Sequence, residues 1–261
     1  VKRHLDFALD VARQAGEVLL KYHGRILEQV WTGTTHFKTL ADEENDALAR
    51  SAIRETFPDH GILSEEGEPV RSKSPFTWVV DGVDGTNGFR SGFTDHFAFC
   101  IALCENGVPV VGVVNAAKRG EFYSASRGNG AFCNGERIRA SGLENVNHAL
   151  VCVDSGKTDP TSHLPFVRRL LQPDGVVDVI HTSCASVPLC LVASGVLHAH
   201  LATSPSPEDV AASVCVAREA GCRVTNLNGS GWGISNPSVL AANPVLHKKL
   251  FEVLGLGKEK K

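Results

Sequence analysis

Two aspartates three positions apart, Asp81 and Asp84, are the residues of this sequence best suited to chemistry. They close an apolar run, and Gly82 and Gly85 stand beside them. Such a run predicts a buried strand that holds the side chains at its end rigidly, and glycines let the backbone turn and approach a bound group. Hard divalent cations prefer oxygen ligands. The segment therefore predicts a cation site, with the carbonyl of Val83 as a further ligand.

The residues that follow these acids suit a phosphate group. Gly85, Thr86 and Asn87 would place free backbone N–H groups and a hydroxyl beside the cations. A helix that starts there would add the positive end of its dipole. The same pattern of aspartate, glycine and asparagine also suits an ordinary turn between a strand and a helix. The pattern alone leaves both interpretations open.

Three more acidic positions stand at the ends of predicted elements. Glu65 and its neighbour Glu66 follow a short strand-like stretch, and adjacent glutamates are most often solvated. Asp42 begins a predicted helix that runs to about residue 57, and Asp209 lies near the start of another. Either aspartate could simply cap its helix.

These motifs resemble those of the inositol monophosphatase superfamily, which comprises magnesium-dependent, lithium-sensitive phosphatases. The family signature is an apolar strand followed by Asp-Pro-Ile-Asp-Gly-Thr, and residues 81–86 read Asp-Gly-Val-Asp-Gly-Thr. The resemblance continues upstream in Glu65 and Glu66, and downstream in residues 209–212 and 219–221. Three dispersed motifs in the right order, spanning nearly the whole chain, are more specific than any one of them.

The resemblance implies an α+β fold with layers in the order α-β-α-β-α, and it implies a set of metal ligands. Glu65, Asp81 and the carbonyl of Val83 would hold one Mg²⁺. A second Mg²⁺ would be held by Asp81, Asp84 and Asp209, the last reaching across from the second half of the chain. A third, weaker ion would complete a site of two or three Mg²⁺.

The resemblance also implies catalytic and substrate-binding roles. Thr86 and Glu65 would position the attacking water, and Asp42 would be the partner of Thr86. The substrate would lie against Gly85, Thr86, Asn87 and Asp209. Further residues could line the pocket, although each also suits a structural or solvated role: Arg90, His96, His181 and Ser183.

The substrate is predicted to be a small phosphate monoester resembling inositol 1-phosphate, but two departures weaken the inositol assignment. The family's substrate-binding glutamate, seven residues before the third aspartate, is Ala202 here, and the tryptophan before that aspartate is Glu208. Adenosine 3′,5′-bisphosphate, histidinol phosphate and fructose 1,6-bisphosphate remain alternatives. So does a family member that binds metal or ligand without turnover.

The composition limits the classes of binding partner that the protein is expected to have. Lysine and arginine total 26 against 29 acidic residues, a net charge of −3, which argues against general nucleic-acid or membrane-surface binding. Eight cysteines without a C-x-x-C pair suggest reduced core thiols. No signal-like or membrane-spanning apolar run is present. We therefore expect a cytoplasmic protein, and the resemblance implies a homodimer.

The apolar periodicity predicts two halves. The first, residues 1–144, opens with amphipathic helix 4–23, contains the strand that leads into Asp81, and continues into a hairpin of 97–104 with 108–115 and further antiparallel strands. The second, residues 145–261, alternates strands and helices and supplies Asp209. Its predicted strands are 149–153, 176–180, 196–201 and 239–242, and its predicted helices are 161–172, 185–195, 208–220 and 244–254.

Overall fold

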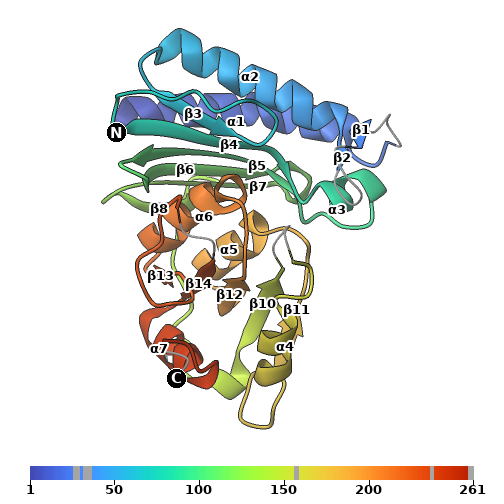
Figure 1. Cartoon of the computed structure of the whole chain (residues 1–261), viewed down its shortest axis with the longest axis vertical. Helices are drawn as coiled ribbons and strands as arrows, with labels where there is room; N and C mark the ends of the chain where they lie inside the picture. The colour runs from blue at the N-terminus through green and yellow to red at the C-terminus, as the bar shows by residue number, and fades with distance from the viewer. Residues whose placement is uncertain (26–29, 32–36, 156–158, 236–237, 258–261) are drawn as a thin grey trace.

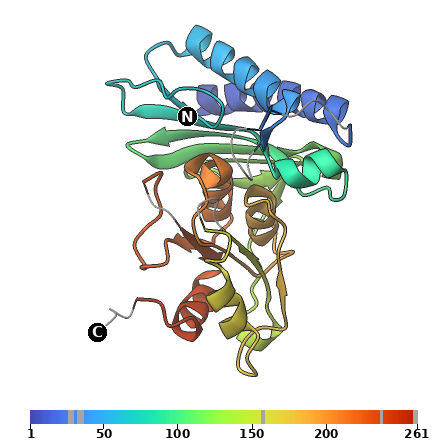
Figure 2. The ribbon, with the colours of Figure 1, turned by 45° about the vertical axis from the view of Figure 1, so that its right-hand side comes forward.

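Five layers of secondary structure make up the computed structural model (Figure 1). It describes residues 1–25, 30–31, 37–155, 159–235 and 238–257. The layers alternate helices, a seven-stranded sheet, helices, a five-stranded sheet and helices, and turning the molecule keeps this order visible (Figure 2). The predicted α+β fold with layers α-β-α-β-α is therefore confirmed.

The outer layer at the top of Figure 1 consists of α1 (Lys2–Tyr22) and α2 (Leu40–Thr56). The apolar stripe of α1 is buried, from Ala8 through Leu19, as the helical spacing of these residues predicts. Both helices pack on one face of the seven-stranded sheet. The glycine- and threonine-rich residues 32–35, whose composition predicts a loop, lie outside the described residues. The short strands β1 (Val30–Trp31) and β2 (Phe37–Lys38) precede and follow them in the sequence.

The seven-stranded sheet belongs entirely to the first half of the chain, and its strands pair in sequence order. Only β3 and β4 run parallel, and every later pair is antiparallel. The strands are β3 (Gly61–Ser64), β4 (Phe76–Asp84), β5 (Ala98–Glu105), β6 (Val108–Ala116), β7 (Glu121–Ser126), β8 (Gly130–Cys133) and β9 (Glu136–Ile138). The predicted hairpin is present, with Asn106 and Gly107 both at positive φ in its turn.

Two helices form the middle layer between the sheets, α5 (Ser186–Ala193) and α6 (Pro207–Glu219). Every residue of α5 is buried. The largest apolar core combines these helices with side chains from both sheets, such as Cys100 of β5 and Ala241 of the second sheet. The two halves of the chain therefore share a core, and the division at residues 144 and 145 stays a prediction.

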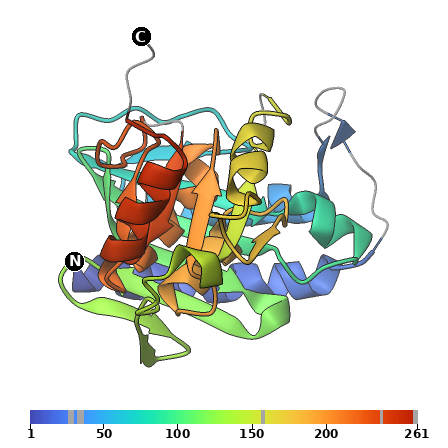
Figure 3. The same ribbon diagram turned by 90° about the horizontal axis from the view of Figure 1, so that it is seen from below.

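The second sheet is mixed, with the order β11-β10-β12-β14-β13. Its first three strands run parallel and the last two join antiparallel. The strands are β10 (Leu150–Asp154), β11 (Asp178–Ile180), β12 (Ala199–Ala202), β13 (Arg223–Thr225) and β14 (Val239–Ala242). Helices α4 (Leu164–Leu170) and α7 (Pro244–Val253) cover its outer face (Figure 3).

Some predicted element ends differ from the structure. The helix expected over 161–172 begins only at Leu164, because the Asp159 carboxylate accepts from the amide and hydroxyl of Thr161 and makes a turn first. The strand expected from residue 196 begins at Ala199, because the amides of Val196 and Leu197 bond the Leu191 carbonyl and close α5. Strand β13 has no counterpart among the predicted strands.

All eight cysteines carry free thiols, and seven of them are buried. This agrees with the prediction of reduced core cysteines. Among the described residues, no helix is long and apolar enough to cross a bilayer.

Candidate active site

The two aspartates of the central motif lie on an irregularity in β4. Asp81 pairs with Cys100 and Asp84 pairs with Ala98, so the register shifts between them. The one extra residue on β4 forms a bulge, which re-aims side chains at the end of a strand. The amide of Val83 donates to Asp81 Oδ1 at 2.9 Å, and the Thr86 hydroxyl donates to the Val83 carbonyl at 2.9 Å.

The start of α2 packs directly over this bulge. Asn45 Nδ2 donates to the Gly82 carbonyl at 2.9 Å. A Cβ atom at position 82 would lie 2.8 Å from the Asp42 carbonyl oxygen and 3.1 Å from its Cα. Any larger residue there would push the helix away. The glycine that replaces the family's usual proline is therefore matched to a close approach of α2.

Three carboxylates converge next to the bulge. Glu65, Asp81 and Asp209 each offer an oxygen, and these atoms all lie within 4.8 Å of one another. Asp81 and Asp209 are 1% and 7% exposed, whereas Glu65 is exposed. Like charges this close and this buried repel strongly unless a cation lies between them. An all-oxygen set of this kind fits Mg²⁺ or Ca²⁺.

Asp84 is not a member of that group, and its carboxylate is held by the second half of the chain. Oδ2 accepts from the amides of Ala185 and Ser186 at 3.0 and 2.7 Å and from the Ser186 hydroxyl at 2.5 Å. The Cys184 thiol donates to the same oxygen at 3.1 Å. These donors stand at the start of α5, and they orient Asp84 beside the three acids.

Asp209 both caps its helix and faces the other two members of the acid group. It is the third residue of α6, and its Oδ2 accepts from the amide of Ser206 at 3.0 Å as part of a capping box. The other members of the acid group come from the end of β3 and from β4. The structure thus brings Asp209 of the second half of the chain next to Glu65 and Asp81, and its role as a metal ligand stays a prediction.

Asp42 also caps its helix. Its Oδ2 accepts from the Thr39 amide at 2.7 Å and from the Thr39 hydroxyl at 2.5 Å. Burial raises the pKa of Asp42 to about 7, against the opposing effect of the Thr39 hydrogen bonds, and the charges of Glu66 and Glu65 raise it further. The hydroxyl of Thr86 bonds Val83 instead, and an Asp42–Thr86 partnership stays a prediction.

The predicted phosphate-binding residues open α3 (Thr86–Ser91). Gly85 has φ +86°, and a Cβ atom there would lie 2.5 Å from the His96 carbonyl oxygen, so this position requires glycine. Thr86 is half-buried and Asn87 is exposed. Their roles toward phosphate stay predictions.

The four predicted pocket-wall residues lie on two segments. Arg90 is on α3, and His96 follows it, with its ring Nδ1 2.9 Å from the Thr94 hydroxyl. His181 and Ser183 lie on the loop before α5, with His181 Nε2 3.2 Å from the Ser183 hydroxyl. Ala202 is fully buried at the end of β12 and offers no polar group to a substrate.

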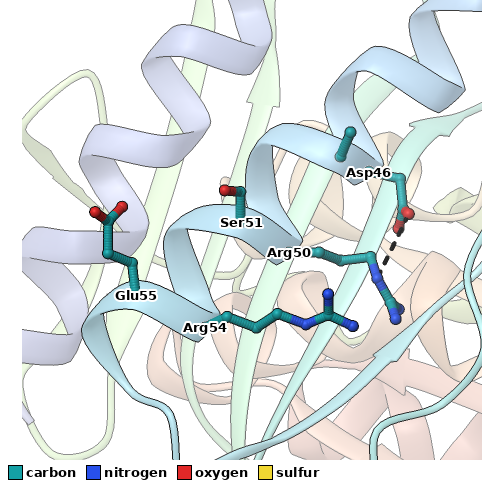
Figure 4. A pocket seen from close by; sticks show the side chains of 6 residues that line it. Asp46, Arg50, Ser51, Arg54 and Glu55 are labelled. Carbon is teal, nitrogen blue, oxygen red and sulfur yellow. Dashed lines mark ion pairs between the residues drawn. The ribbon is translucent and has the colours of Figure 1, made fainter.

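A depression on the outer surface of α2 is separate from these residues (Figure 4). It contains no predicted site residue, and Arg50 there is already bonded to the Ser64 hydroxyl at 2.8 Å and to the Glu68 carbonyl. Its lining residues are Asp46, Ala47, Arg50, Ser51, Arg54 and Glu55.

Sequence reasoning missed the residues that support the acids from behind. Cys184, Ala185 and Ser186 are about a hundred positions from Asp84 and carry no recognisable motif. Asn45 had a usable signal, because it stands one helical turn after Asp42 and therefore on the same face of α2.

Comparison with known proteins identifies the class. The family model described as "Inositol monophosphatase family" matches residues 1–255. A protein of Aquifex aeolicus named fructose-1,6-bisphosphatase/inositol-1-monophosphatase is 28% identical, over 97% of this chain and 96% of its own length. A Nus factor SuhB of Pasteurella multocida is 31% identical, over 95% of this chain and 94% of its own.

Solved structures agree with these relatives. An inositol monophosphatase of Thermotoga maritima superposes with a TM-score of 0.86 at 28% identity, covering 97% of each chain. The extragenic suppressor protein suhB of Bartonella henselae gives a TM-score of 0.89 at 26% identity, covering 98% of this chain and 100% of its own. The fold and the family model thus define a protein of the phosphatase class. The chain belongs to the inositol monophosphatase family.

Proposed function

We propose that this protein is a Mg²⁺-dependent phosphatase that hydrolyses a small phosphate monoester resembling inositol 1-phosphate. The observation that carries the proposal is the convergence of Glu65, Asp81 and Asp209 within 4.8 Å. Magnesium bound there would offset phosphate charge, lower the pKa of a bound water and stabilise the leaving oxygen.

The residues of the chain would divide the remaining work. Glu65 is the exposed member of the acid group, so it can accept a proton from an incoming water. Thr86, one turn from the bulge, would help to orient that water. The amides of Gly85 and Thr86 would bind phosphate oxygens, and Asn87 would lie beside them. Asp84, held on Oδ2, would present Oδ1 to the cation site.

The identity of the substrate depends on the wall that lacks the family's glutamate. Ala202 has no side-chain acceptor for sugar hydroxyls. His181 and Ser183, on the loop before α5, do carry polar side chains. The Aquifex relative carries both phosphatase names, so fructose 1,6-bisphosphate belongs among the candidates. Adenosine 3′,5′-bisphosphate and histidinol phosphate complete the alternatives. Relatives named Nus factor keep the non-catalytic alternative open, but retention of the four acids favours catalysis.

Phosphate release tests the proposal. We would assay these four substrates and an aryl phosphate with Mg²⁺, with and without Li⁺, and repeat the assay with Asp84→Asn. We expect phosphate release that depends on Mg²⁺ and is inhibited by Li⁺. We expect Asp84→Asn to abolish this release although the variant stays folded. Near-normal turnover by that folded variant would contradict the metal assignment. Mg²⁺ binding without release from any substrate would favour the non-catalytic alternative.

A further inference from the structure

Asp154, at the end of β10, is a buried carboxylate that the proposed reaction does not use. It is 3% exposed and accepts hydrogen bonds on both oxygens. Oδ2 accepts from His200 Nε2 at 3.1 Å and from the Cys152 thiol at 3.2 Å. Oδ1 accepts from the amides of Thr182 and Ser183, each at 3.1 Å. The group therefore joins two strands of the second sheet to the loop before α5.

The cluster of Cys152, Asp154 and His200 has the donor types of a transition-metal site, and its ligand atoms lie within 4.8 Å of one another. The histidine argues against such a site. A metal on Nε2 would leave the proton on Nδ1, and His200 Nδ1 is buried with no hydrogen-bond partner among the described residues. A proton on Nε2, donated to Asp154, satisfies the ring better. The cluster is therefore a hydrogen-bonded anchor.

What the anchor holds is an unusual backbone conformation. Ser183 has φ +56°, a left-handed conformation that costs free energy for a residue other than glycine. Successive amides in such a bend converge on one side and form a small anion-binding nest. Asp154 Oδ1 occupies that nest, and the Thr182 hydroxyl further closes the loop by donating to the Cys184 carbonyl at 2.8 Å.

The same loop leads directly into the donors that hold Asp84. Cys184 follows Ser183, and the thiol of Cys184 together with the amides of Ala185 and Ser186 contacts Asp84 Oδ2. We propose that Asp154 is a positioning residue for Asp84: by fixing the bend at Ser183, it sets where the start of α5 lies and so where the Asp84 carboxylate points. This inference rests on the proposed function, in which Asp84 is a metal ligand.

Removal of the Asp154 carboxylate should change the Mg²⁺ affinity and the protection of backbone amides from hydrogen exchange. Supporting groups behind metal ligands typically change affinity about 10- to 100-fold when removed. For Asp154→Ala we expect the Mg²⁺ concentration for half-maximal effect to rise about 10-fold, in both a direct binding titration and the phosphatase assay. Hydrogen exchange at the amides of residues 182–186 should accelerate.

Thr225→Val provides the matched control. Its hydroxyl lies 2.9 Å from His247 Nε2, so the variant breaks another buried polar contact, on β13 at the far edge of the same sheet. We expect this variant to lose thermal stability while keeping wild-type Mg²⁺ dependence and wild-type exchange at residues 182–186.

Asp154→Asn decides the question if Asp154→Ala does not fold. Its amide oxygen can still accept from Thr182 and Ser183, but its NH₂ group opposes the His200 donor, so a smaller rise in Mg²⁺ requirement and exchange is expected. Wild-type values of both readouts in a folded Asp154 variant would overturn the inference. Absence of Mg²⁺ binding by the wild-type protein would instead overturn the proposed function, and exchange would still report on the loop.

Discussion

Two acidic sites in this molecule have opposite surroundings. Glu65, Asp81 and Asp209 face one another, whereas Asp154 faces two amides, a thiol and two imidazoles. The donors around Asp154 stabilise its negative charge without any ligand. The three acids instead bring like charges together, and a cation bound between them would offset that repulsion. Burial alone thus does not mark a metal ligand, and the groups facing the carboxylate do.

The pKa values follow the same contrast. Burial raises the pKa of Asp42, which stands close to the charges of Glu65 and Glu66, to about 7. Burial acts in the same direction on Asp154, but the hydrogen bond and charge of His200, with help from Cys152 and Thr182, leave its pKa below the usual value. Both acids accept hydrogen bonds, so the charge beside each one separates them: acidic neighbours raise the pKa of Asp42, and an imidazole lowers that of Asp154.

The largest expected effect is the difference in turnover and melting temperature between variants that neutralise one acid at each of the two sites. Asp81→Asn should lower Mg²⁺-dependent turnover by about 10³-fold, since metal stabilisation of the transition state is worth several kcal/mol. Without Mg²⁺ its melting temperature should not fall, because a repulsion is relieved. Asp154→Asn should instead melt earlier and still be stabilised by added Mg²⁺. Thermal melts with and without Mg²⁺, beside the phosphatase assay, test the contrast. Equal turnover by Asp81→Asn and wild type would break it.

A pH series on metal-free protein should show the next largest effect. The folded pKa of Asp42 lies above its unfolded value, so its contribution to stability is complete below pH 3.8 and is lost as pH rises through about 7. That loss amounts to at most about 4 kcal/mol. Asp42→Asn should flatten the dependence.

Denaturant unfolding of both proteins between pH 4 and 7.5, with a chelator present, measures this difference. The other titrating groups are common to wild type and variant, so they cancel in the comparison. If the free energies of unfolding of the two proteins changed with pH in parallel, the pKa of Asp42 would not be raised by folding.

A packing change behind the acids should have the smallest effect. Gly82→Ala places a methyl group 2.8 Å from the Asp42 carbonyl oxygen, so the start of α2 must move, at a cost of about 1–3 kcal/mol. Gly142→Ala meets nothing within 4 Å and should be neutral or slightly stabilising. Denaturant midpoints of the two variants give the comparison. If Gly82→Ala matched the control, the close approach of α2 would not matter to the bulge.

Local pattern predicted much of the fold and of the site. The stripe of α1, the strand into Asp81 and the capping positions of Asp42 and Asp209 all follow from residue spacing, and the structure has them. The bulge between Asp81 and Asp84 could not be read, since it depends on pairing with β5. The contacts of Ser186 with Asp84 could not be read either, because they join residues a hundred positions apart through the packing of α5.

The origin of Asp209 in α6 also bears on how the protein is made. Chains fold as they leave the ribosome with the first half ahead, so Glu65 and Asp81 emerge long before Asp209. A chain that stops before Asp209 therefore has only part of the acid group. It also lacks α6, which packs on one face of the first sheet. The acid group is therefore complete only after α6 has been made and has packed on the first sheet.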